Sequence, residues 1–189
     1  MVRLKELPAV IPSQGEWTEA DYLSMHTNRL VELSDGHLEF LPMPTHKHQM
    51  IVAFVYGLLK IFVDEHAPGF VLFAPLRVRL WPGKFREPDI MYLGAEHRDR
   101  IKEYWEGADL VMEIVSPGKR EHDLETKRAE YAKAGIPEYW IVDVVQEQIT
   151  VLVLAKKSYR VHGEFCRGDI ATSKLLPGFA VSVGEVLSA

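Results

Sequence analysis

The stretch DLVMEIVSPG (109–118) holds a carboxylate, Glu113, inside a run of apolar residues. A short apolar run that ends in turn-forming residues, here Pro117 and Gly118, predicts a β-strand buried in the core. Charged side chains are rare in such strands unless they are paired or bind a metal. Glu113 therefore either has a protein partner or faces a functional site.

The composition is that of one globular domain spanning residues 1–189, with 47% hydrophobic and 26% charged residues. The longest apolar run, MIVAFVYGLL (50–59), is shorter than the roughly 20 residues that cross a bilayer, so we expect no membrane segment. The N-terminus has no secretory apolar region. Cys166 is the only cysteine, which excludes an internal disulfide and a cysteine-rich zinc site. A cytoplasmic location is the simplest expectation.

The charge balance is acidic, with 22 Lys and Arg residues against 27 Asp and Glu residues and a net charge of −5. Proteins that bind nucleic acid stably usually have a basic excess. We therefore expect any contact with nucleic acid to be transient and to use a local patch.

Hydrophobic patterns and turn signals predict a mixed sheet covered by helices. The expected helices cover 18–26, 48–67 and 120–135, the last ending at Gly135. The expected strands are a hairpin around SDG (34–36), 70–74, 76–81, 89–93, 110–115, 139–145 and 148–154, followed by short β or irregular segments over 159–189. The alternating strand LRVRLW (76–81) is expected at an edge or with one wet face. The fold class is α/β, with α+β as the alternative.

Three carboxylates interrupt predicted strands: Glu32, Asp89 and Glu113. Asp89 follows Pro88, which cannot donate to a β-ladder, so Asp89 is expected to open its strand at the rim of the sheet. If 89–93 and 110–115 are neighbours, Asp89 and Glu113 lie close enough to share a divalent ion, and Mg²⁺ suits such a pair. The alternative is that each acid is a structural strand-end or ion-paired group.

The helix 120–135 brings candidate cations towards these acids. Tyr131 lies on its apolar stripe, and Lys127 and Arg128 flank that stripe on opposite sides. Asp123 and Lys127 are four residues apart, so a solvated pair is one interpretation. The other is a cation that faces the carboxylates and orients an attacking water. Periodicity does not choose between Lys127 and Arg128.

Other chemistries find little support in the sequence. His46 and His48 lie two residues apart, but no third zinc ligand follows by spacing. His48 has a second possible role near the carboxylates if the helix start packs there. Phosphate-loop and dinucleotide motifs are absent, and Ser116 lacks the surroundings of a catalytic nucleophile.

Three segments resemble the Uma-two family: ELSDGHLEFLPMPTHKHQMIV (32–52), REPDIMYL (86–93) and DLVMEIVSPGKREHDLETKRAEYAKAGIPEYWIVD (109–143). The resemblance covers most of 18–154. This bacterial family, common in cyanobacteria, has the PD-(D/E)xK restriction-endonuclease-like fold, a mixed central sheet flanked by helices.

The resemblance assigns roles to individual positions. Glu32 matches the acid before the first hairpin, Asp89 the Pro-Asp motif, and Glu113 the second metal-binding acid. His48 matches the family's helical histidine. In the parent nucleases a lysine lies two residues after the second acid, where this chain has Val115. The family resembles those members whose lysine has moved to the following helix, which implies Lys127.

The expected function is a divalent-metal-dependent phosphodiesterase, a DNA endonuclease using Mg²⁺ or Mn²⁺. Asp89 and Glu113, with the Ile114 carbonyl, are expected to hold the ion, and Glu32 to bind a second ion or orient water. Lys127 is expected to position the nucleophilic water.

The supporting residues expected around the ion are His48, Asp123 and Tyr131. Two alternative functions stay open: a silent nuclease-like domain used for protein association, and a hydrolase of small phosphodiesters or nucleotides. The sequence also leaves open a homodimer that would address two strands.

Overall fold

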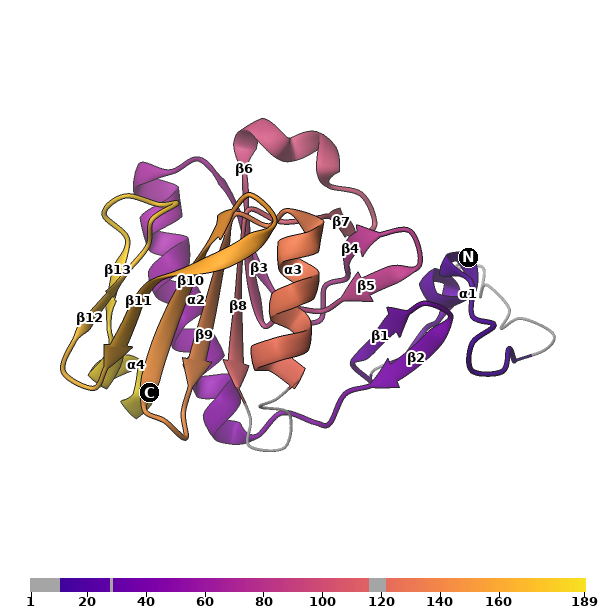
Figure 1. Ribbon diagram of the computed structural model, residues 1–189, viewed down its shortest axis with the longest axis horizontal. Coiled ribbons are helices and arrows are strands. Elements are labelled where there is room, and N and C mark those ends of the chain that lie inside the picture. Colours follow the sequence, from indigo (N-terminus) through magenta and orange to yellow (C-terminus); the bar gives the residue numbers. More distant parts are fainter. Residues whose placement is uncertain (1–10, 28, 116–121) are drawn as a thin grey trace, which may run out of the picture.

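The computed structural model describes residues 11–27, 29–115 and 122–189, with the side chains of 122–124 left outside the description. Its centre is a six-stranded sheet in the order β11-β10-β9-β8-β6-β3 (Figure 1). The strands are β3 (Gly69–Phe73), β6 (Ile90–Gly94), β8 (Leu110–Val115), β9 (Glu138–Asp143), β10 (Gln148–Ala155) and β11 (Ser158–Cys166). β8 and β9 are parallel and the other neighbours are antiparallel, so the sheet is mixed, as predicted.

Two helices cover opposite faces of this sheet (Figure 1). α2 (His46–His66) packs with Met112 and Ile114 of β8 in one core. α3 (Arg128–Ala134), which follows the π-helical segment η2 (His122–Lys127), packs with Val111 and Val115 in the other. β8 alternates its side chains between two apolar layers and is therefore buried on both faces.

A second sheet has the order β2-β1-β5-β4-β7. Its strands are β1 (Val31–Ser34), β2 (His37–Phe40), β4 (Val78–Trp81), β5 (Lys84–Arg86) and β7 (Trp105–Glu106). The hairpin of β1 and β2 encloses a small third core together with α1 (Glu19–Ser24), whose Thr18 forms a capping box with Asp21. The segment β5 then continues directly into the Pro88-Asp89 motif.

The remaining elements lie outside these two sheets. They are η1 (Ala95–Arg100), the two-stranded sheet of β12 (Ile170–Thr172) and β13 (Ala180–Ser182), and the helix α4 (Val183–Ser188). No helix in the described ranges is long and apolar enough to span a membrane.

Several sequence expectations need correction. Of the two alternatives for the strand 76–81, the edge position is wrong, because β5 and the short β7 flank β4. The partly wet face remains, since three of the four β4 residues are half-buried and the Arg79 side chain is 26% exposed. β5 was not expected, and the tail contains a nine-residue strand and a helix where short or irregular segments were predicted. Residues 120 and 121 of the predicted helix 120–135 lie outside the described residues. Gly135 does end that helix in the left-handed conformation, with φ 79°.

Candidate active site

Asp89 is the residue just before β6, at the end of the central sheet where Glu113 lies on the neighbouring strand β8. β6 and β8 are antiparallel neighbours, and their printed register ends with Ile90 paired to Met112, one residue away from both acids. On the other side of β6, the Asp89 carbonyl accepts a hydrogen bond from Ala74 N at 3.1 Å, which extends the pairing with β3 to this residue. The predicted pairing of the two strands is confirmed.

The Asp89 carboxylate is held by one strand and one helix. Its Oδ2 accepts a hydrogen bond from the Ile114 backbone N–H at 2.8 Å and lies 3.1 Å from Nε2 of His48. His48 stands in the first turn of α2, which begins at the N-cap Thr45. The Asp89 side chain is 15% exposed, and within the described part of the chain its Oδ1 has no hydrogen-bond donor. That oxygen is the one available to a ligand.

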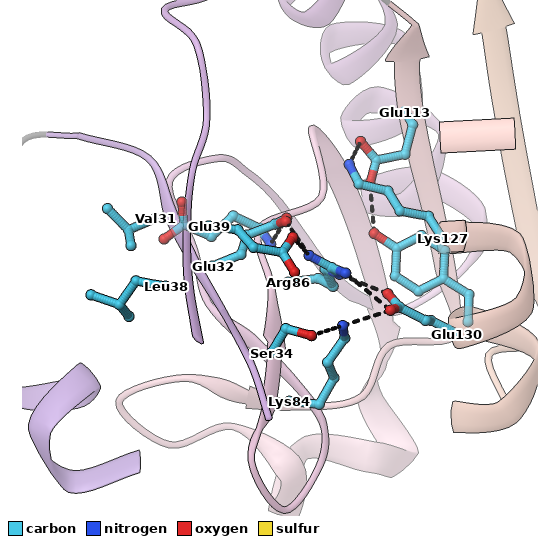
Figure 2. A network of polar contacts seen from close by, with 12 residues as sticks. Val31, Glu32, Ser34, Leu38, Glu39, Lys84, Arg86, Glu113, Lys127 and Glu130 are labelled. Carbon is cyan, nitrogen blue, oxygen red and sulfur yellow. Dashed lines mark hydrogen bonds and ion pairs between the residues drawn. The ribbon is translucent and has the colours of Figure 1, made fainter. Parts of the chain in front are cut away.

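The Glu113 carboxylate faces the helical segment formed by η2 and α3 and has one partner on each (Figure 2). Lys127 Nζ lies 2.8 Å from Oε2, and the Tyr131 hydroxyl donates to Oε1 at 2.5 Å. Lys127 and Tyr131 are four residues apart and so lie on one helical face. All three side chains are buried, with exposures of 3% for Glu113, 5% for Lys127 and 0% for Tyr131. The buried carboxylate of β8 thus has protein partners, and they are the lysine and tyrosine singled out in the sequence.

The alternative cation, Arg128, is half-buried and does not share this geometry. Lys127 stands where η2 passes into α3, and such π-helical turns occur often at functional sites. Val115, at the position of the lysine in the nucleases that this chain resembles, is 1% exposed and packs in the core beneath α3. The lysine of this site therefore comes from the helix.

Glu32 is completely buried, and both of its oxygens are engaged. Oε1 accepts the Glu87 backbone N–H at 3.0 Å, and Oε2 accepts from Arg86 Nη1 at 2.6 Å. Burial by itself raises the pKa of Glu32, but the charges of Lys127 and Arg86 outweigh it and lower the pKa. Glu32 is thus an anion beside Lys127, and its role as a ligand or water-orienting group stays a prediction.

A network centred on Arg86 joins the hairpin to α3 (Figure 2). Arg86 is 1% exposed and forms ion pairs with Glu32 at 2.6 Å, Glu39 at 2.5 Å and Glu130 at 2.7 Å. Its contact with Glu130 is bidentate, because Nη2 also donates to Oε1 at 3.0 Å. Lys84 adds a second cation 2.5 Å from Glu130. Glu130 follows Lys127 by three residues, so this network fixes the helix that carries the lysine.

Arg86, Lys84 and Glu130 were not among the residues predicted for the site. The available signal was the alternation of Lys84 and Arg86 about Phe85, which places both cations on one face of a strand. Their acidic partner on α3 lies 44 residues further along the chain from Arg86, so no local pattern indicates the pair.

Replacing Glu130 with Gln tests the network through its pH dependence. Burial acts to raise the pKa of Glu130, but the hydrogen bonds and charges of Arg86 and Lys84 lower it overall. A folded-state pKa below the unfolded value gives stability that is present above the unfolded pKa and is lost as pH falls through the folded pKa. We expect Glu130→Gln to lower the free energy of unfolding by about 2 kcal/mol at neutral pH.

The difference between native protein and variant should shrink as the pH falls below 4.5, the ordinary pKa of this carboxyl. Urea unfolding across that range measures it, with Glu125→Gln as the control, since Glu125 is exposed just before α3. A difference that stayed constant into strong acid would show that the Glu130 charge is not what stabilises the contact.

Another group of possible metal ligands lies at the opposite end of β8. Within the described ranges, Glu96, His97 and Asp109 are the one set of three such residues whose ligand atoms lie within 4.8 Å of one another. Asp109 Oδ2 already accepts from the Gly94 N–H at 2.8 Å and lies 2.8 Å from His97 Nδ1. These contacts tie η1 to the start of β8, which is a sufficient structural role.

The Asp89–Glu113 end fits a divalent ion by the chemistry of its donors. Mg²⁺ and Mn²⁺ prefer oxygen ligands, and Mg²⁺ typically takes one or two carboxylates and keeps several waters. Asp89 offers Oδ1, and Glu113 is held in a fixed orientation by Tyr131. Asp123, the remaining expected supporting residue, has its side chain outside the described residues.

A mixed sheet with helices on both faces and carboxylates near the ends of neighbouring strands is the arrangement expected of a restriction-endonuclease-like fold. The chain belongs to the Uma2 family: the family model, described as "Putative restriction endonuclease", matches residues 17–184. A search of the curated proteins found no match.

The fold recurs in a solved structure from Anabaena variabilis, described as "a putative nuclease belonging to DUF820". The two chains share 17% sequence identity with a TM-score of 0.76, over 91% of this chain and 98% of the other. At this identity the likeness shows the fold.

Proposed function

We propose that this protein is a divalent-metal-dependent DNA endonuclease of PD-(D/E)xK type. One observation supports the proposal: a buried lysine and the buried Glu113 meet at 2.8 Å, and the next residue of the same strand, Ile114, donates its backbone N–H to the Asp89 carboxylate at 2.8 Å. An acid pair beside an amine is the set of groups that metal-assisted phosphodiester hydrolysis needs. The family description supports the same class of reaction.

The side chains divide the task. Asp89 and Glu113, with the Ile114 carbonyl, would hold Mg²⁺ or Mn²⁺, which when bound lowers the pKa of a coordinated water and offsets phosphate charge. His48 fixes Asp89, and Tyr131 fixes Glu113. Lys127 would orient the attacking water and stabilise charge that develops on the phosphate.

The substrate we infer is DNA, bound transiently because the chain carries a net charge of −5. A homodimer stays a prediction.

The test is cleavage of plasmid and single-stranded DNA by the native protein with Mg²⁺, with Mn²⁺ and with EDTA. We expect cleavage of at least one of the two substrates with either metal and none with EDTA. Asp109→Asn, purified identically, is the control for the acidic group at the far end of the sheet and should cleave as the native protein does. Equal background with and without metal would contradict the proposal and favour a role in protein association.

A further inference from the structure

A cavity of about 170 Å³ opens directly beside Asp89. Its polar end is formed by Asp89 and His48, the same pair that lies 3.1 Å apart in the candidate site. The rest of its wall is mainly apolar and comes from three separate segments: Leu30 before β1, Met43 before α2, and Pro75 after β3. The cavity therefore shares Asp89 and His48 with the candidate site, and the rest of its lining differs from that site in chemistry.

The volume fits a small flat ring. An engineered apolar cavity of about 150 Å³ admits benzene, so about 170 Å³ accommodates the single ring of a pyrimidine. Val52 of α2 and Met43 supply apolar surface for the ring faces, and the Gln49 amide at the rim offers both a donor and an acceptor to a base edge. A ring with polar edges and apolar faces matches this lining.

The position of the cavity beside Asp89 indicates which base of the nucleic acid it would bind. A phosphate bound at Asp89 would be attached directly to a nucleoside of the DNA. Because Asp89 also lines the cavity, the base of that nucleoside would be next to the cavity. A base pair is two bases wide and is stacked on its neighbours, so it does not fit a space for one ring. A base enters only when it is unpaired and unstacked.

We propose that this cavity binds the unpaired base of the nucleotide next to the phosphate to be cleaved, which makes single-stranded DNA the substrate. The inference rests on the proposed function, since that function puts the phosphate at Asp89. The net charge of −5 agrees with it, because duplex binding draws on contacts to many phosphates whereas a base pocket adds affinity without charge.

The test measures binding and is independent of cleavage. Fluorescence anisotropy follows a labelled oligothymidylate, the same strand with every base removed, and the thymidylate strand paired with its complement, each in Ca²⁺ and in EDTA. We expect the thymidylate single strand to bind about tenfold more tightly than the other two.

Two variants place the effect in the cavity. Val52→Phe fills the space and should abolish the preference for the strand with bases. Met43→Ala removes part of the wall from a residue that is 78% exposed, so the fold is not at risk, and it should weaken that preference several-fold. Met50→Ala is the matched control, because Met50 is exposed in the same region of α2 and does not line the cavity.

Equal binding of the three strands, or variants that bind as the native protein does, would overturn the proposal. Preference for the single strand with bases, lost in the two cavity variants and kept in the control, would support it even if no strand is cut. Cleavage indifferent to the presence of bases would leave the nuclease proposal standing and refute the base pocket.

Discussion

Glu113→Gln is expected to weaken Mg²⁺ binding at least tenfold and to reduce DNA cleavage on the order of 10³-fold. The substitution keeps the size of the side chain, but it removes the charge that a divalent ion requires, and its single amide oxygen can accept from only one of Lys127 and Tyr131. Lys127→Met is expected to separate the two effects. It removes the amine that would stabilise the reacting phosphate, with a cost of roughly 10²–10³-fold in cleavage, and leaves both metal carboxylates in place.

The measurement is calorimetric titration with Mg²⁺ beside cleavage rates for the native protein and both variants. Asp109→Asn again serves as the control, because Asp109 is an acid that directly precedes β8 at the other end of the sheet. Unchanged Mg²⁺ binding in Glu113→Gln would remove Glu113 from the metal site. Native cleavage by Lys127→Met would assign the lysine to packing.

Arg86→Met is expected to lower the free energy of unfolding by about 3–5 kcal/mol, the loss found when one partner of a buried ion pair is removed. The change leaves Glu32 without its arginine in a position with 0% exposure and deprives Glu130 of its bidentate contact. Against a typical total of about 5–15 kcal/mol this is a large fraction. The midpoint of urea unfolding measures it.

Arg79→Met is the matched control. Arg79 also pairs with carboxylates, Glu19 at 3.0 Å and Glu106 at 3.8 Å, but its side chain is 26% exposed. Pairs in contact with solvent are worth about 0–1 kcal/mol, so we expect a small loss. Equal losses in the two variants would show that burial of the Arg86 network has no special energetic weight.

The elements predicted well are those with strong local signals. The hairpin around SDG, the strand opened by Pro88-Asp89 and the helix ended by Gly135 each have turn or capping residues at the boundary. β5 escaped prediction because three residues are too few to show a period, and α4 because its six residues follow a strand without a break.

The candidate site, like the fold, was predicted only where local sequence patterns exist. The predicted neighbouring of the two strands next to Asp89 and Glu113 is confirmed by the pairing of β6 with β8. Hydrophobic periodicity left Lys127 and Arg128 equivalent, and only the resemblance to a family implied Lys127. The sequence did not predict the network of Arg86, because Glu39 and Glu130 are 47 and 44 residues away from Arg86 in the chain. Partners at such distances are fixed by tertiary packing and leave no local pattern.

The burial of Val115 beneath α3 has a consequence for how such a site can diversify. Because a helix supplies the amine in the proposed site, residue 115 needs no role in the reaction. Only packing in the core constrains it. In the proposed site the sheet would determine ion affinity, while the rotation of α3 would determine whether the amine reaches its target, and a slip of one residue turns a helix by about 100°. Under that proposal, a change in the helix would alter the rate of turnover without altering the affinity for metal.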